Sequence, residues 1–156
     1  MDSGKTKMNI QFIKSNEKRE IEKILESQFG TSKLDFLLIK TAKEKVRGFS
    51  GSLSKEEIMQ LGEIANIEVI GLYILRMEHG FRLSFDATQI LGGEIKKNII
   101  EVNEEQARSW MRGFDLLVQV QSGSYVIKYG ELFLGCGKSN GQVILNHVSK
   151  DRRLKK

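Results

Sequence analysis

The fold is decided by residues 98–148, NIIEVNEEQARSWMRGFDLLVQVQSGSYVIKYGELFLGCGKSNGQVILNHV. This stretch predicts one strand, one short helix and then four short strands that are joined by glycine-containing turns. Such a pattern is typical of a small closed or half-closed β-barrel. Two hairpins are expected within it, and Asn-Gly is the strongest short-range signal for a hairpin. They pair Leu116–Val120 with Tyr125–Tyr129 and Leu132–Lys138 with Gln142–Val148, the second around Asn140-Gly141.

The helix of this stretch has recognisable start and stop signals. Asn103, followed three residues later by Gln106, predicts a capping box, and Gly113 stands where a helix-ending glycine is expected. Arg108 and Arg112 are four residues apart, so we expect them to share one solvent-facing stripe. The sequence therefore predicts a short helix that presents two arginines together.

The residues before this stretch predict a small α/β domain that ends at Gly92-Gly93, the best boundary signal in the chain. Amphipathic periodicity predicts its helices, and apolar runs rich in β-branched residues predict its strands. We therefore expect an α+β protein, with an N-terminal α/β domain over residues 1–93 and a β-barrel with one short helix over residues 94–156. The expected N-terminal strands are Asn9–Ile13, Leu34–Ile39, Ile67–Met77 and Phe81–Phe85. A helix is expected at Asn16–Gly30 and a helical turn at Asp86–Leu91. A further helix is expected after a cap formed by Ser54 and Glu57, with a buried stripe of Ile58, Leu61, Ile64 and Ala65.

The positive charge of the chain is concentrated in its C-terminal third. Residues 1–94 hold 14 Lys and Arg against 14 Asp and Glu, whereas residues 95–156 hold 11 against 6. A localised cationic cluster on a neutral body is typical of a protein with a polyanionic partner. The alternative explanation is a solvated basic tail that keeps the protein soluble.

The composition excludes several classes of protein. There is no apolar run of about 18 residues, so no membrane span is expected. The start, MDSGKTKMNIQF, lacks the apolar region of a secretory signal. A single cysteine excludes an internal disulfide and a multi-cysteine zinc site, which fits a reducing compartment. We therefore expect a cytoplasmic protein with no membrane partner.

Three segments carry a resemblance to a known family. Gly113–Val118 (GFDLLV) and Gly130–Lys138 (GELFLGCGK) resemble the PUA domain, the RNA-binding module named for pseudouridine synthases and archaeosine transglycosylases. Gly141–Arg153 is similar to the last strand of the PUA-like domain that follows the catalytic domain in some Nol/Nop/Sun-type RNA cytosine methyltransferases. A PUA domain preceded by a small α/β domain resembles the stand-alone Nip-seven type of ribosome-biogenesis factor. The resemblance implies a protein that binds ribosomal or transfer RNA.

Catalytic interpretations of the glycines and the cysteine are weaker than structural ones. Gly135–Ser139 contains Gly-Lys-Ser, but a phosphate loop needs a glycine where Leu132 stands and a helix where Asn140-Gly141 predicts a hairpin. A nucleophilic Cys136 needs an activating neighbour. The Pro-Cys motif of the methyltransferases cannot occur in a chain without proline. We expect Cys136 to be a buried structural residue.

No other constellation predicts catalysis or metal binding. His79 and His147 are the only histidines and lie in different predicted domains, so no metal site is expected. Glu104 and Glu105 are explained as first-turn acids that the helix dipole favours. Trp110 has core spacing, which favours packing over base stacking. We therefore expect no enzymatic activity, no metal and no cofactor.

The RNA-binding side chains are expected on the helix and on the C-terminal segment. The resemblance implies that RNA lies against the helix and the adjacent strand and that basic residues of the last strand also contact it. Arginine suits phosphate through its planar fork, and lysine supplies a point charge. Because no row of exposed aromatic residues is predicted, we expect recognition of shape and backbone more than of bases. The predicted RNA-binding residues are Arg108, Arg112, Lys138, Lys150, Arg152, Arg153 and Lys155.

The sequence thus predicts a non-enzymatic protein that binds structured ribosomal or transfer RNA in ribosome biogenesis or RNA modification. Two alternatives stay open. In one, the chain is an accessory RNA-binding subunit whose N-terminal domain docks on a methyltransferase or another processing factor. In the other, it is an enzyme with a site in the N-terminal domain, which a buried carboxylate with a strongly shifted pKa beside a deep pocket would indicate.

Overall fold

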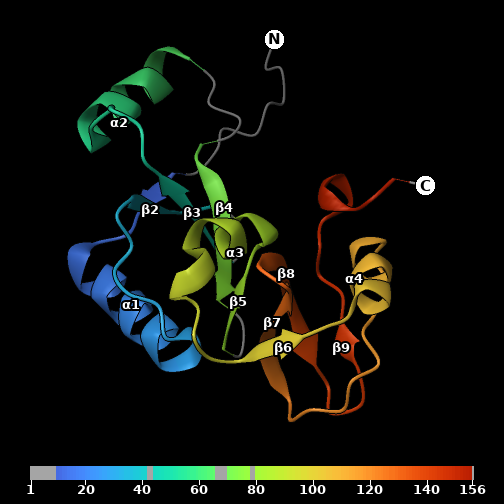
Figure 1. Ribbon diagram of the computed structural model, residues 1–156. Helices are drawn as coiled ribbons and strands as arrows, with labels where there is room; N and C mark the ends of the chain where they lie inside the picture. Colours follow the sequence, from blue (N-terminus) through green and yellow to red (C-terminus); the bar gives the residue numbers. More distant parts are fainter. Residues whose placement is uncertain (1–9, 42–43, 66–69, 78–79, 156) are drawn as a thin grey trace.

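The computed structural model describes residues 10–41, 44–65, 70–77 and 80–155, which form two sheets with helices around them (Figure 1). Predicted features at Asn9, Ile67–Val69 and His79 lie outside the described residues. None of the described helices is long and apolar enough to cross a membrane. The elements are β1 Gln11–Phe12, α1 Ser15–Phe29, β2 Leu37–Lys40, β3 Lys45–Phe49, α2 Lys55–Ile64, β4 Leu72–Met77, β5 Phe81–Leu83, α3 Phe85–Leu91, η1 Gly92–Glu94, β6 Ile99–Glu101, α4 Glu104–Met111, β7 Gly123–Tyr129, β8 Leu132–Ser139, β9 Ile144–Leu145 and η2 Lys150–Arg152.

The first sheet has the strand order β1-β2-β3-β4-β5, and each neighbouring pair is antiparallel. The predicted amphipathic helix is confirmed as α1, which lies beside this sheet (Figure 1). Its apolar positions Ile21, Leu25 and Phe29 are buried in the main hydrophobic cluster. The helix ends at Gly30, whose φ of 76° is the left-handed conformation that favours glycine.

The second helix, α2, does not bury the apolar stripe that its periodicity predicts. Ile58 is 1% exposed and packs in a small cluster with Ile39 and Ile70. Ile64 is 84% exposed, and Leu61 and Ala65 are exposed as well. The prediction of a buried stripe was wrong. Ile58 is the buried residue of α2, and the rest of the helix projects away from the sheet (Figure 1).

The second sheet has the strand order β6-β7-β8-β9 and lies to the left of and below α4 in Figure 1. β6 is parallel to β7, and the other neighbouring pairs are antiparallel. The predicted hairpin at Asn140-Gly141 is confirmed, because Lys138 pairs with Leu145 across it. The Asn140 side-chain oxygen accepts a hydrogen bond from the Val143 N–H at 3.0 Å, which closes the turn.

The other predicted hairpin is wrong. β7 pairs with β6 and β8, and Leu116–Val120 forms no strand beside it. Leu116 instead makes an isolated bridge to Ile144, and the Val120 carbonyl accepts a hydrogen bond from the Ser139 hydroxyl at 2.8 Å. Leu116, Val118 and Val120 pack in the hydrophobic cluster under α4, whereas Leu117 is 83% exposed. The alternation of this segment therefore reflects burial of one side rather than strand pairing.

The two sheets are joined by continuous packing. One hydrophobic cluster contains Ala87 of α3 together with Val126 of β7 and Cys136 of β8. At the same place the Thr88 hydroxyl of α3 accepts a hydrogen bond from the Gly135 N–H at 3.1 Å. Helices and mainly antiparallel strands thus confirm the predicted α+β class, whereas the division into two domains stays a prediction.

Candidate nucleic-acid interface

The helix α4 begins at a capping box and is fixed on the second sheet by Trp110. Asn103 Oδ1 accepts from the Gln106 N–H at 2.9 Å, and Gln106 Oε1 accepts from the Asn103 N–H at 3.0 Å, which is the predicted capping box. Trp110 is 1% exposed, and its indole N–H donates to the Leu134 carbonyl at 2.6 Å. Gly137 leaves room for the indole, since a Cβ there would lie 2.6 Å from the Trp110 ring. The opposite stripe of α4 therefore faces solvent from a fixed position.

Arg108 and Arg112 lie on this exposed stripe. Arg108 donates to Glu104 Oε1 from Nη2 at 2.8 Å and from Nε at 3.1 Å. Both side chains of the pair are 63% exposed, and exposed helix pairs of this spacing contribute about 0.3–0.5 kcal/mol. Such a weak pair is no obstacle to a phosphate that competes with the carboxylate.

The C-terminal segment folds back onto the end of α4. The Leu154 N–H donates to the Met111 carbonyl at 2.8 Å, and Arg153 Nε donates to the Val148 carbonyl at 2.9 Å. The Arg153 guanidinium covers Gly113, where a Cβ would lie 2.7 Å from Nη1. The structure therefore brings the C-terminal basic residues to the end of α4 that carries its second exposed arginine. Lys150 and Lys155 of this segment are exposed.

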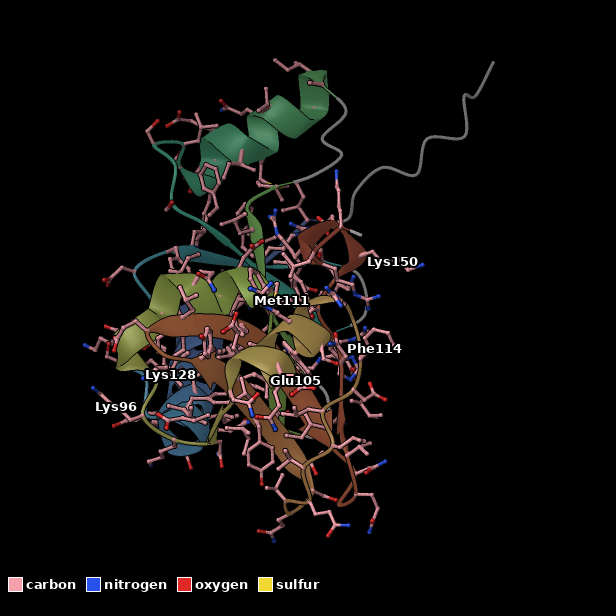
Figure 2. The ribbon with its side chains drawn as sticks, turned by 45° about the vertical axis from the view of Figure 1, so that its right-hand side comes forward. Lys96, Glu105, Met111, Phe114, Lys128 and Lys150 are labelled. Carbon is pink, nitrogen blue, oxygen red and sulfur yellow. The ribbon has the colours of Figure 1, made fainter. Side chains whose placement is uncertain are left out.

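Phe114 adds an aromatic ring to this surface. It is 63% exposed, and Figure 2 shows it on the same side of the molecule as Lys150, with Lys96 and Lys128 on the opposite side. An exposed ring beside cations is a platform on which a base of single-stranded RNA can stack. Helical periodicity gives no signal for Phe114, because this residue follows the helix-ending Gly113.

A shallow apolar groove lies along α4. Its volume is about 170 Å³, and the exposed side chains of Leu132 and Leu154 line it. Arg108 also lines the groove. An apolar surface next to a guanidinium suits the ribose and base of a nucleotide whose phosphate the arginine holds.

Lys138 does not belong to this surface. It is two residues from Cys136 on β8, so both side chains lie on the same face of the strand. Gly137, between them, faces Trp110 and α4. Lys138 therefore lies on the sheet face that points away from α4.

Arg152 points toward the N-terminal half of the chain. Its Nε lies 3.0 Å from Asp86 Oδ1, and its Nη2 donates to Asp86 Oδ2 at 3.1 Å. The hydrogen bond that Arg152 donates to Asp86 and the charge of that carboxylate raise the pKa of Arg152 above its ordinary value. Of the seven predicted residues, the structure thus groups five around α4 and the C-terminal segment, and places Lys138 and Arg152 elsewhere.

The structure bears on Cys136 as a nucleophile and on metal binding by clustered side chains. The predicted burial of Cys136 is confirmed, and this burial raises the pKa of the thiol to about 12. The thiol stays protonated near neutral pH, whereas a nucleophile must be a thiolate. Among the described residues, no group of three or more His, Cys, Asp or Glu side chains could hold a metal ion.

Comparison with known proteins finds relatives of the part of the chain that carries this surface. Residues 97–154 match the family model described as the Methyltransferase RsmF PUA domain. A curated relative, ribosomal RNA small subunit methyltransferase F of Shewanella oneidensis, is 31% identical over 77 residues, which are 47% of this chain and 16% of that protein. The chain therefore spans a small part of this relative's length.

A solved structure matches nearly the whole chain. The conserved PUA domain protein from Thermoplasma acidophilum superposes with a TM-score of 0.61 over 92% of this chain and 97% of that chain, at 12% sequence identity. At this identity the likeness shows the fold, and it confirms the predicted PUA-like fold. Residues 97–154, the part that carries α4 and the C-terminal segment, thus match the PUA domain model of RsmF methyltransferases and have a PUA-like fold.

Proposed function

We propose that this chain is a non-enzymatic RNA-binding protein that acts on ribosomal or transfer RNA in ribosome biogenesis or RNA modification. The observation that carries the proposal is the match of residues 97–154 to the PUA domain of a methyltransferase named for small-subunit ribosomal RNA. Because the match includes a small fraction of that relative and lies in its RNA-binding module, it favours RNA binding without transfer of a methyl group. Ribosomal RNA is the first target to test.

The geometry supports recognition of the RNA backbone by the surface around α4. Arg112 and Lys150 are exposed on it, and the Arg153 guanidinium is held at the end of α4 by the Val148 carbonyl. These cations would bind successive phosphates, while Phe114 would stack on an unpaired base. Such contacts select single-stranded or distorted RNA by shape and stacking more than by sequence.

The proposal is tested by the salt dependence of RNA affinity. On single strands the logarithm of the binding constant should fall with the logarithm of salt concentration by about 0.7 per phosphate contact. The double variant Arg112→Glu/Lys150→Glu should bind a small-subunit rRNA fragment and a transfer RNA more weakly and with a smaller slope. The double variant Lys33→Glu/Lys96→Glu changes the net charge equally at exposed sites outside the surface and is the matched control.

The outcomes separate local contacts from net charge. Equal loss in the two double variants would contradict the assignment of this surface and leave only a general effect of charge. A wild-type affinity that does not change with salt would remove the electrostatic basis of the proposal. A wild-type protein that transfers a methyl group to RNA when given a methyl donor would contradict the non-enzymatic part.

A second candidate is an accessory RNA-binding subunit of a methyltransferase or another RNA-processing complex. The exposed apolar side chains of α2 favour it, since Met59 is 51% and Ile64 84% exposed on one short helix. Exposed apolar surface of this kind is often a protein contact. Affinity capture from the native host with wild-type protein and with Met59→Lys/Ile64→Lys separates the candidates: a processing enzyme captured only by the wild type supports the accessory role.

A further inference from the structure

A row of basic side chains crosses the first sheet outside the PUA domain. The strand register places Lys45 opposite Arg76 on β4, and Arg76 opposite Arg82 on β5. The adjacent pair, Leu75 and Leu83, is in the main hydrophobic cluster, so the basic row lies on the other face of the sheet. The register therefore brings basic residues of three strands to one face of the sheet.

The row forms one wall of a pocket between the first sheet and the C-terminal segment. The other walls come from His147, Ser149 and Arg152 of that segment and from Asp86 of α3. The pocket has a volume of about 150 Å³, below the roughly 300–1,000 Å³ of sites that hold whole small molecules. Four lysine and arginine side chains and one carboxylate line it. Its size and charge suit a single anionic group.

Arg82 provides the strongest indication of a ligand. The residue is only 9% exposed, yet it lines the pocket. Among the hydrogen bonds and ion pairs that join described residues, none satisfies the Arg82 guanidinium. A buried charge is unfavourable unless it is paired, and the planar fork of arginine matches two oxygens of a phosphate.

The pocket continues the surface proposed for RNA. Arg152 of η2 lines the pocket. Lys150, the first residue of η2, lies on the same side of the molecule as Phe114 (Figure 2). The next residue, Arg153, lies at the end of α4 against Gly113. We propose that this pocket holds a phosphate group of the RNA strand bound along α4, an inference that rests on the proposed function.

Single substitutions in the full chain test the pocket. Arg82→Gln and Lys45→Gln should each lower the affinity for single-stranded RNA by roughly tenfold at low salt, because each removes a charge-assisted contact to phosphate. Each should also reduce the salt slope by about 0.7. Arg19→Gln removes the same charge from an exposed position on α1 and should change neither quantity. Arg82→Lys, which keeps the charge and loses the fork, should fall between wild type and Arg82→Gln.

A second arm uses inorganic phosphate as the probe. The Arg82 Nε–H signal in a nitrogen–proton NMR spectrum should shift when phosphate is added, and RNA should displace the phosphate and shift the same signal. If phosphate shifts the signal and RNA does not compete, the pocket is a site for a free anion and the proposal is overturned.

The pocket and the proposed function can fail separately. If wild type binds RNA and the pocket variants behave like Arg19→Gln, the pocket is overturned while RNA binding by the PUA domain stands. If wild type binds no RNA, both fall. Should Arg82→Gln not fold, as judged by its melting curve, Lys45→Gln at an exposed position decides the question.

Discussion

The two groups of arginines in this chain differ in burial and in the element that supplies their carboxylate partner. On α4, Arg108 and Arg112 are exposed, and Arg108 pairs with Glu104 of its own helix. At the pocket, Arg82 is buried, and Arg152 makes one hydrogen bond and one further ion-pair contact to Asp86 of α3. A fixed cation loses less conformational freedom on binding, so it suits one particular phosphate. The comparison indicates that the α4 surface suits several phosphates of an RNA strand, whereas the pocket suits a single phosphate.

The largest expected effect is the loss of stability when Trp110, which holds α4 on the second sheet, is replaced. Trp110→Ala should destabilise the protein by about 3–5 kcal/mol, because it empties a fully buried site and leaves the Leu134 carbonyl without its donor. Chemical denaturation measures this loss. Trp110→Phe keeps most of the packing and should cost clearly less. If the α4 account is right, Trp110→Ala also loses RNA affinity while inorganic phosphate still shifts the Arg82 signal.

A methyl group added at Gly137 on β8 should disturb the packing between α4 and the second sheet. A Cβ at Gly137 would lie 2.5 Å from Ile144 Cγ2 and 2.8 Å from the Leu145 carbonyl oxygen. Gly137→Ala should therefore cost about 1–3 kcal/mol through overpacking, read as a lower melting temperature. Gly93→Ala is the control, since a Cβ there meets nothing within 4 Å. Equal melting temperatures for the two variants would contradict the close packing of Trp110.

The arginines of α4 could be predicted from the sequence, whereas the row at the pocket could not. The α4 cap and stripe depend on spacings of three and four residues, which local sequence reports directly. Lys45, Arg76 and Arg82 come from three strands, and only the register brings them together. β3 was not assigned because its segment is polar and contains glycine.

Periodicity also failed where tertiary contacts decide. The stripe of α2 predicts an apolar face, but it does not determine whether another element covers that face. The alternation of Leu116–Val120 predicts one buried side, which a segment outside the sheet satisfies as well as a strand. Local signals therefore predicted the α4 cap and the Asn140-Gly141 turn, and they failed where the partner of an element had to be known.

A smaller change in RNA affinity is expected when the carboxylate partner of either arginine group is neutralised. Asp86→Asn and Glu104→Gln each remove an acid that is paired with an arginine, and neither should change stability by more than about 1 kcal/mol. Both should tighten RNA binding, by about two- to fivefold for Asp86→Asn, since its carboxylate lies inside the pocket, and by less for Glu104→Gln. Filter binding at low salt measures this. Weaker binding by Asp86→Asn would mean that the ion pair is needed to hold the C-terminal turn in place.

The smallest expected effect is on the alkylation of Cys136, which should hardly occur in the native protein. Cys136 lies in the cluster between the two sheets, and burial raises the pKa of its thiol to about 12. At pH 8 the folded protein should therefore hold almost no thiolate and should resist alkylation until denaturant is added. Mass spectrometry after iodoacetamide treatment checks this. Rapid labelling of native protein would show that the junction between the sheets opens readily.

The most direct test of RNA binding by α4 and the C-terminal segment is ultraviolet crosslinking of the full chain to a single-stranded rRNA fragment, with peptide mapping by mass spectrometry. We predict crosslinks within residues 104–115 and 147–155, with Phe114 prominent, and a weaker set around Arg82. Crosslinks concentrated on α1 or α2, with none in the C-terminal peptides, would contradict the account.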